Sequence, residues 1–189
     1  MIIGLAAKKH SGKDTVADYI VEKYGFKKYG FGDPIKEIGR ILFDFNDEQL
    51  YGSLKENIDK RWSIRPREFF QKFGTDYGQL IMPKHFPKAF KDIEVREFWV
   101  KKFWLWYERE LEKNPLLNVV IPDVRFVHEY NFLISKKAYI FKIKRKQIHL
   151  DSHLSETELD KYTDDMFHAI IENDGTKEEL FDTVRELIN

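Results

Sequence analysis

Residues 7–15 have the types and the spacing of a phosphate-binding loop. They read Ala-Lys-Lys-His-Ser-Gly-Lys-Asp-Thr, with the pair Gly12-Lys13 directly before a helical pattern. In such a loop the backbone N–H groups and the helix N-terminus converge on anionic oxygens, and the lysine adds positive charge. A Cβ at Gly12 would collide with a phosphate that approaches the backbone. The pattern predicts a polyphosphate site; the alternative is an ordinary strand-to-helix turn with a solvated lysine.

Two loop positions depart from the standard pattern. Ala7 stands where the first glycine is expected, which is tolerable only if its backbone is not left-handed. Asp14 stands where a Ser or Thr hydroxyl usually contacts Mg²⁺. Because Mg²⁺ favours oxygen ligands, the Asp14 carboxylate is a candidate ligand, directly or through water. Thr15 then offers its hydroxyl to the phosphates.

A second group of candidate residues follows the apolar run 119–122. Asp123 stands where phosphate-loop proteins keep the carboxylate that organises Mg²⁺, and Arg125 offers a fork of donors to a phosphate. In the alternative, Asp123 caps the next helix and Arg125 pairs with Glu129 four residues on. Together with Lys13, the two residues indicate a nucleoside-triphosphate site.

Strands and helices that alternate along the chain would position these residues. Strands are predicted over 2–7, 117–122, 138–143 and 169–172. Helices are predicted up to Tyr24, from Asp33-Pro34 with Asp33 as the N-cap, from Arg65-Pro66 to about Phe73, over 95–112 and 127–135, and from a capping box of Thr176 and Glu179 to Ile188. Residues 44–61 are predicted to form a polar loop. The alternation implies a parallel sheet with ligands beyond the carboxyl ends of its strands.

The predicted helix over 95–112 is apolar nearly all round and carries three tryptophans, Trp99, Trp104 and Trp106. A helix of this kind is normally buried, so we expect these rings in the core and not in a base-stacking platform.

The composition excludes several classes of protein. The 189 residues suit one domain, and 42% hydrophobic residues are enough for a buried core. The 32 basic and 32 acidic residues cancel, which disfavours a nucleic-acid partner. Without cysteine there is no disulfide scaffold or thiolate metal site, and the six histidines lack zinc-ligand spacing. No apolar run is long enough to cross a membrane and no export signal is apparent, so we expect a cytoplasmic protein.

Six segments, in the same order along most of the chain, resemble those of phage-type deoxynucleoside monophosphate kinases. They are Gly12-Lys13-Asp14-Thr15-Val16-Ala17-Asp18, Asp33-Pro34-Ile35-Lys36, Trp62-Ser63-Ile64-Arg65 with Phe73-Gly74-Thr75-Asp76, Pro122-Asp123-Val124-Arg125 with His128-Glu129, His153-Leu154-Ser155-Glu156, and Asn173-Asp174-Gly175 with Glu178-Glu179-Leu180.

The resemblance implies an α/β P-loop kinase fold, with a central parallel sheet flanked by helices, in a single domain over residues 1–189. It implies a monophosphate-binding helical region over about 33–113 and a lid over about 145–165. The implied reaction transfers the γ-phosphoryl group of ATP to a deoxynucleoside monophosphate, with Mg²⁺ as cofactor and small-molecule nucleotides as partners. A homodimer and, for a viral protein, a location in the host cytoplasm are also suggested.

The resemblance further implies roles for individual residues. ATP would be bound by Ser11, Gly12, Lys13, Asp14, Thr15, Asn173 and Gly175, with Asp14 and Asp123 arranging Mg²⁺. The acceptor would be bound by Asp33, Lys36, Trp62, Arg65, Asp76, Asp123, Arg125 and Glu129. The catalytic cations would be Lys13, Arg65, Arg125 and Arg145.

Two of these roles have alternatives. Trp62 would stack on or wall the acceptor base, or else be an anchor of the core. Arg145 would close over the triphosphate from the lid, or else belong to a solvated basic strand end, since it lies in the run Lys-Ile-Lys-Arg-Lys at residues 142–146.

Three other functions compete with the main hypothesis. A P-loop kinase for another phosphorylated metabolite would share the loop and the fold. A nucleotide-binding NTPase switch would need a water-positioning residue, and we identify none in the sequence. A nucleic-acid-binding module is disfavoured by the zero net charge.

Overall fold

The computed structural model of the chain describes residues 1–94, 96–146 and 157–188. Contacts divide the chain into two compact units. Unit 1 comprises Met1–Gly30 and Leu105–Asn189, and unit 2 comprises Phe31–Trp104. The chain therefore leaves unit 1 once and returns to it inside a helix.

Unit 1 is built on a parallel sheet. Its strands in the described residues are β1 (Ile2–Ala7), β2 (Lys27–Lys28), β3 (Val119–Val124), β4 (Tyr139–Lys144) and β5 (Ala169–Glu172). The strand order is β2-β3-β1-β4-β5, and every pair is parallel. Since β1 is central, helices can cover both of its faces, which explains its almost unbroken apolar run.

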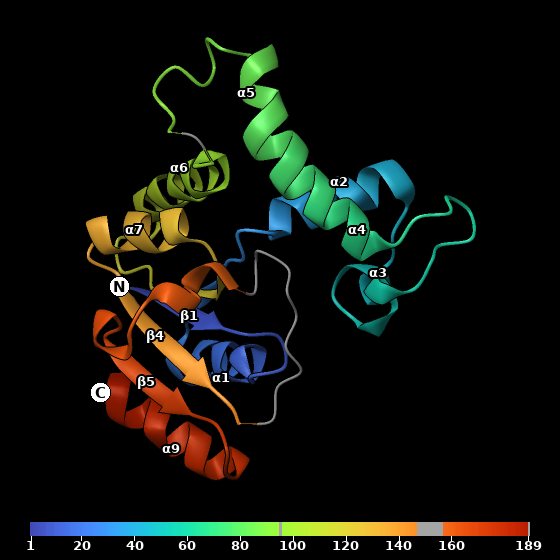
Figure 1. Cartoon of the computed structure of the whole chain (residues 1–189). Coiled ribbons are helices and arrows are strands. Elements are labelled where there is room, and N and C mark those ends of the chain that lie inside the picture. Colours follow the sequence, from blue (N-terminus) through green and yellow to red (C-terminus); the bar gives the residue numbers. More distant parts are fainter. Residues whose placement is uncertain (95, 147–156, 189) are drawn as a thin grey trace. The chain divides into compact units, whose positions relative to one another are not determined.

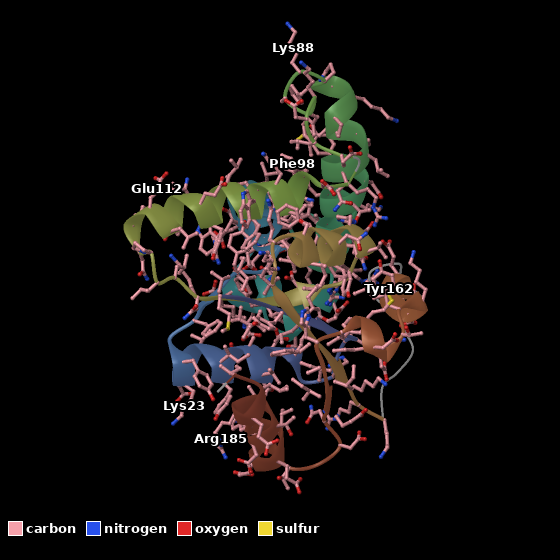
Figure 2. All side chains as sticks on the ribbon, turned by 90° about the vertical axis from the view of Figure 1, so that its left-hand side faces the viewer. Lys23, Lys88, Phe98, Glu112, Tyr162 and Arg185 are labelled. Carbon is pink, nitrogen blue, oxygen red and sulfur yellow. The ribbon has the colours of Figure 1, made fainter. Side chains whose placement is uncertain are left out.

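Helices cover the sheet of unit 1. The regular helices are α1 (Lys13–Tyr24), α7 (Val127–Ser135) and α9 (Lys177–Ile188), with the short 3₁₀ turns η3 (Glu158–Lys161) and η4 (Asp164–Met166) between β4 and β5. Figure 1 shows α1 and α9 on one side of the sheet and α7 on the other, and Figure 2 shows the same arrangement edge-on, with Lys23 on α1 and Arg185 on α9.

The main core of unit 1 lies between the sheet and the pair α1–α9. Val16 and Ile20 of α1 and Val184 of α9 are fully buried there against Leu5 and Ile171 of the strands. Burial of such side chains contributes about 1.5–3 kcal/mol each. This packing fixes where α1 starts, and therefore where the loop after β1 ends.

Unit 2 is helical in its described residues. Its elements are α2 (Asp33–Phe43), α3 (Asp47–Leu50), the 3₁₀ turn η1 (Ser53–Glu56), α4 (Pro66–Gln71), the π-helix η2 (Lys72–Ile81), α5 (Met82–His85) and the first part of α6 (Phe98–Lys113). No helix within the described ranges is both long and apolar enough to span a membrane.

The structure corrects two predictions in the first part of unit 2. Residues 44–61 are not a polar loop, because Asn46 caps α3: its side chain accepts from Gln49 N, and the Gln49 side chain accepts from Asn46 N. Asp33 is not the N-cap of α2. That position belongs to Gly32, and Asp33 is the first helical residue, paired with Lys36 at 2.8 Å.

The predicted end of the third helix at about Phe73 is also wrong, because the helix continues as a π-helix. Trp99 donates its indole N–H to the carbonyl of Gly74 at 2.7 Å. A Cβ at Gly78 would lie 2.7 Å from Cζ2 of the same indole, so only glycine admits the ring there. The wide turns are stabilised by a ring from a distant part of the sequence, which local patterns do not reveal.

The expectation that the tryptophan-rich helix belongs to the core is confirmed for Trp99, which is buried beside Val100 and Phe103. Leu105 in the same helix is exposed, so α6 is less uniformly buried than its composition indicates.

Candidate active site

The loop between β1 and α1 has the backbone that the sequence predicts. Gly12 has φ 96°, which favours glycine, while Ala7 is not among the positive-φ residues of the described chain. His10, at φ 65°, is a left-handed position that the sequence did not indicate. Ser11 is fully buried, and its N–H donates to the Lys8 carbonyl at 3.2 Å.

The first turn of α1 has no side-chain cap. Gly12 is the N-cap and has no side chain to satisfy the N–H groups at the start of the helix. Lys13 Nζ lies 2.6 Å from Oδ2 of Asp14. Asp14 is exposed and Thr15 is half-buried. The helix terminus therefore combines N–H donors and an ammonium group with a carboxylate beside it, as an Mg²⁺-polyphosphate site requires.

The end of β3 lies beside the end of β1, because Ala6 pairs with Val124. Asp123 is therefore at the carboxyl edge of the sheet, half-buried, and Arg125 follows directly after the strand. The alternative in which Asp123 caps α7 is wrong, because the N-cap of α7 is Phe126.

The buried side chain of Glu129 stabilises the turn after β3 by hydrogen bonds. It is buried, and its Oε2 accepts from the backbone N–H groups of Arg125 at 2.8 Å and Phe126 at 3.0 Å. Burial, and after it the charge of Asp123, raises the pKa of Glu129 to about 8. We therefore expect Glu129 to act through the turn after β3; direct contact with the acceptor stays a prediction.

A cavity of about 390 Å³ opens beside the loop, at the carboxyl ends of β1, β3 and β4. Its walls include six cationic side chains: Lys8, Arg125, Lys142, Lys144, Arg145 and Lys146. Two carboxylates, Asp160 and Glu172, also line the cavity, but the cations outnumber them, and this excess of positive charge favours a polyanionic ligand.

The sequence analysis did not single out Lys8, Lys142 or Lys144 as site residues. Lys8 Nζ pairs with Asp160 at 2.8 Å, and Lys142 and Lys144 both pair with Asp164. These residues could have been found from strand pairing. Ala7 pairs with Ile143, which places residues 142–146, at the end of β4 and just after it, beside the loop.

Arg145 contacts the phosphate loop, because its Nη1 donates to the His10 carbonyl at 3.4 Å. Residues 147–156 of the predicted lid, which include the segment His153-Leu154-Ser155-Glu156, lie outside the described residues. The described part that follows is tied to α7, since Glu158 accepts from Val127 N at 3.0 Å.

The turn between β5 and α9 also reaches the loop. Asn173 Nδ2 donates to the Ser11 carbonyl at 2.8 Å, while Gly175 is exposed two residues later. The predicted capping box of α9 is confirmed: Thr176 N donates to Glu179 at 2.7 Å, and Glu179 N donates to Thr176 Oγ1 at 3.2 Å. The structure thus brings Asn173 into contact with the loop that carries Ser11, Gly12 and Lys13, while no described contact joins Gly175 to that loop.

In unit 2, Lys36 has an ordered position near the start of α2. It pairs with Asp33, and its Nζ lies 4.5 Å from the ring centroid of Tyr51. Burial raises the pKa of Tyr51 to about 12, and the charges of Asp33 and Glu37 add to this effect. Lys36 is therefore held by two groups before any ligand arrives.

Trp62 combines features of both of its predicted roles. Its indole N–H donates to the Phe43 carbonyl at 2.8 Å, and its ring meets the Phe43 ring edge-on, at 5.4 Å between centroids. Even so, 46% of the residue is exposed. It is anchored by one edge and leaves part of its surface to solvent.

Arg65 and Asp76 have exposed side chains, and within the described part of the chain neither side chain makes a hydrogen bond or ion pair, although the Arg65 carbonyl accepts from Phe69 N at 3.1 Å. Arg65 is the N-cap of α4, and Asp76 lies in the π-helix. The structure does not join Arg65, Trp62 and Asp76 by direct contacts.

The chain matches a family model described as deoxynucleotide monophosphate kinase, over residues 1–56 and 39–184. It is 36% identical to a putative deoxynucleotide monophosphate kinase of Acanthamoeba polyphaga mimivirus, over 97% of this chain and 94% of that protein. The chain belongs to the deoxynucleotide monophosphate kinase family. The predicted family, fold class and kinase activity are thereby confirmed.

One further relative agrees with this family, and one solved structure shares the fold. The deoxynucleotide monophosphate kinase of Enterobacteria phage T4 is 24% identical, over 99% of this chain and 98% of that protein. The crystal structure of TT1252 from Thermus thermophilus superposes with a TM-score of 0.50 at 15% identity, covering 100% of this chain and 96% of that chain. The second match shows that the fold occurs elsewhere at low sequence identity.

Proposed function

We propose that the protein transfers the γ-phosphoryl group of ATP to a deoxynucleoside 5′-monophosphate, which yields the diphosphate and ADP. The observation that carries this proposal is the loop after β1, with Gly12 at φ 96° and Lys13 at the start of α1, next to a cavity walled by cations. Family membership supports the choice of acceptor.

ATP binding is assigned to unit 1. Lys13 exchanges the Asp14 carboxylate for the β- and γ-phosphates, while Gly12 and Thr15 line the cradle from the loop and the helix. Arg125 and Arg145, at the ends of β3 and β4, offset the negative charge that gathers on the transferred group.

Mg²⁺ fits this site only together with the nucleotide. Among the described residues no group of three or more His, Cys, Asp or Glu side chains could hold a metal ion by itself. Mg²⁺ is commonly held by one or two carboxylates and substrate phosphates, and Asp14 and Asp123 are the carboxylates present at the loop and at the end of β3. Bound there, the ion would neutralise phosphate charge.

Acceptor binding is assigned to residues of unit 2, and the predicted contact of Arg125, in unit 1, with the acceptor phosphate is a separate proposal. Arg65 and Lys36 take the acceptor phosphate, Trp62 offers its exposed surface to the base, and Asp33 and Asp76 accept hydrogen bonds from base or sugar. Monophosphate binding by the region of about residues 33–113 is part of this proposal.

The chemistry needs no strong base. The attacking group is an anionic phosphate oxygen, so the rate depends on alignment and on charge neutralisation around the transferred phosphoryl group. A set of cations from several segments suits that requirement better than a single titrating side chain.

The direct test incubates the protein with Mg-ATP and, in turn, each of the four deoxynucleoside monophosphates and the corresponding ribonucleotides. ADP formed only with an acceptor, together with the matching diphosphate, supports the proposal. Equal ADP release with and without every monophosphate would indicate an NTPase and would refute it. The Lys13→Ala variant, purified in the same way, measures any contaminating host kinase.

We also propose a homodimer in the cytoplasm of the host cell, with free nucleotides and no nucleic acid among the partners. The viral relatives support the location in the host cytoplasm, and the zero net charge supports the absence of a nucleic-acid partner. The homodimer is proposed from the family resemblance. Light scattering of the purified protein tests the dimer, and a monomeric mass would refute it.

A further inference from the structure

The phosphate loop is held from outside by side chains at the ends of two neighbouring strands. Asn173, directly after β5, donates from Nδ2 to the Ser11 carbonyl at 2.8 Å. Arg145, directly after β4, donates to the preceding carbonyl, that of His10, at 3.4 Å. Two successive loop carbonyls are therefore directed towards β4 and β5.

The main chain of Asn173 is itself fixed. Its backbone N–H donates to the Lys144 carbonyl at 2.8 Å, so the residue is tied to the end of β4. The amide of Asn173 is thus carried by the sheet, which is the rigid part of unit 1.

Inside the loop, Ser11 N donates to the Lys8 carbonyl, and Ser11 Oγ is buried and has no hydrogen-bond partner among the described residues. His10 has φ 65°, a left-handed conformation that costs a residue with a Cβ some backbone energy. A loop of this kind needs an external anchor to keep one conformation.

The hydrogen bond from Asn173 determines the direction of an N–H group. In a trans peptide the carbonyl oxygen and the amide hydrogen point to opposite sides. When the Ser11 carbonyl points to Asn173, the Gly12 N–H points away from it. The close fit also explains the glycine, because a Cβ at residue 12 would lie 2.3 Å from Asn173 Nδ2.

We propose that Asn173 is a positioning residue, which locks the Ser11–Gly12 peptide with its N–H directed at the bound polyphosphate. This inference rests on the proposed function only in taking the loop as a polyphosphate site. It differs from a role in which Asn173 contacts the nucleoside of ATP, because a positioned loop recognises phosphates whatever base they carry.

The role predicts a loss of affinity that does not depend on the base. We compare wild-type protein with Asn173→Leu, which keeps the approximate size of the side chain and removes the donor. The ligands are Mg²⁺ with ATP, GTP or inorganic tripolyphosphate, measured by calorimetry. Asn173→Leu is expected to weaken all three by the same factor, about 3- to 10-fold, as for the loss of one hydrogen bond.

Kinetics separate positioning from a general loss of structure. The KM for ATP should rise by the same factor, while the KM for the acceptor and the melting temperature stay near those of the wild type. The matched control is Asp174→Asn in the same turn. It keeps the acceptor for Lys146 N, which now bonds Asp174 Oδ1 at 2.8 Å, and it does not touch the loop.

Each outcome decides between the possibilities. If Asn173→Leu weakens ATP but leaves tripolyphosphate unchanged, Asn173 contacts the nucleoside and the inference is wrong. Wild-type affinity for all three ligands also overturns it. If the wild-type protein binds neither ATP nor tripolyphosphate, it is the proposed function that fails.

A second variant covers the case in which Asn173→Leu does not fold. Asn173→Asp has the same shape but places a carboxylate against the Ser11 carbonyl. It should weaken ATP and tripolyphosphate equally, and by more than tenfold. A loss confined to ATP would again overturn the inference.

Discussion

The two units prepare their binding groups in different ways. Unit 1 presents main-chain N–H groups at the start of α1, which the packing of α1 against the sheet holds in place. Unit 2 presents side chains such as Trp62, in the turn before α4, and Arg65, at the N-cap of α4, and aromatic rings pack against one another there. Under the proposed division of roles, recognition of the ATP phosphates depends on backbone geometry in unit 1, whereas recognition of the acceptor depends on side chains in unit 2.

The largest expected effect is on kcat and comes from a substitution at the proposed ATP site of unit 1. Lys13→Ala should lower kcat by about 100- to 1,000-fold, the range for removal of one donor from a preorganised charged site. Lys23→Ala, at the other end of the same helix, is the control and should leave kcat unchanged (Figure 2). Steady-state kinetics with melting curves measure both; unchanged turnover of Lys13→Ala would remove this residue from the mechanism.

The acceptor side should respond differently. Arg65→Ala should raise the KM for the monophosphate about 10- to 100-fold and leave the KM for ATP near its original value, because a charge-assisted hydrogen bond is worth about 1.5–3 kcal/mol. Lys72→Ala removes an exposed cation of the neighbouring π-helix that pairs with Glu68, and is the control. If Arg65→Ala weakened ATP more than the acceptor, the division of roles between the units would be wrong.

Substitutions of one glycine in each unit should lower the free energy of unfolding for different reasons. Gly78→Ala in unit 2 should cost about 1–3 kcal/mol, because its Cβ would lie 2.7 Å from the Trp99 ring. Gly25→Ala in unit 1 should cost about 1–2 kcal/mol for a different reason, since Gly25 has φ 70° with open space around it.

Substitution by asparagine distinguishes crowding at Gly78 from the left-handed backbone conformation at Gly25. Asparagine tolerates left-handed backbone, so Gly25→Asn should recover much of the lost stability. Gly78→Asn should not, because crowding and not backbone conformation is the cause. Denaturant unfolding measures all four variants, and full recovery by Gly78→Asn would contradict the crowding argument.

The remaining comparison concerns the pH dependence of stability. The pKa of Glu129 is raised from 4.5 to about 8, so the folded protein holds this proton more tightly than the unfolded chain does. Its contribution to stability is therefore complete at low pH and is lost as the pH rises from about 5 to 8. Relative to Glu129→Gln, the free energy of unfolding of the wild type should fall by about 1.4 kcal/mol per pH unit in that window.

Asp59 in unit 2 should show the opposite sign. Hydrogen bonds from Arg61, and then from Gln49, hold the pKa of Asp59 well below its usual range. The stabilising effect of the ionised Asp59 is present at neutral pH and is lost in acid, so Asp59→Asn should reduce the acid sensitivity of the free energy of unfolding.

The Glu129 prediction for unit 1 has its own test. Parallel curves of unfolding free energy against pH for the wild type and Glu129→Gln, between pH 5 and 8, would contradict it.

Much of unit 1 was predictable from sequence. The apolar run of β1, the Gly12-Lys13 pair and the Thr176–Glu179 capping box are local signals, and each is found in the structure within a residue or so of its predicted place. The boundaries of β3 were displaced by two residues, because a continuous apolar run does not mark where a buried strand ends.

Unit 2 was less predictable. The capping box of Asn46 and Gln49 was a local signal that the polar composition of residues 44–61 obscured. The π-helix has no such signal, because it depends on Trp99, which lies 25 residues from the Gly74 carbonyl that it contacts.

The sequence by itself determined which loop binds phosphate, since glycine, lysine and a helix start are adjacent in the chain and their geometry is local. Tertiary structure alone decided how that loop is held. Asn173 meets Ser11 across 162 positions, and Lys8 and Lys144 share one cavity wall only because the ends of β1 and β4 are neighbours in the sheet. Strand order is set by the packing of whole elements, and that packing is not written in any short segment of sequence.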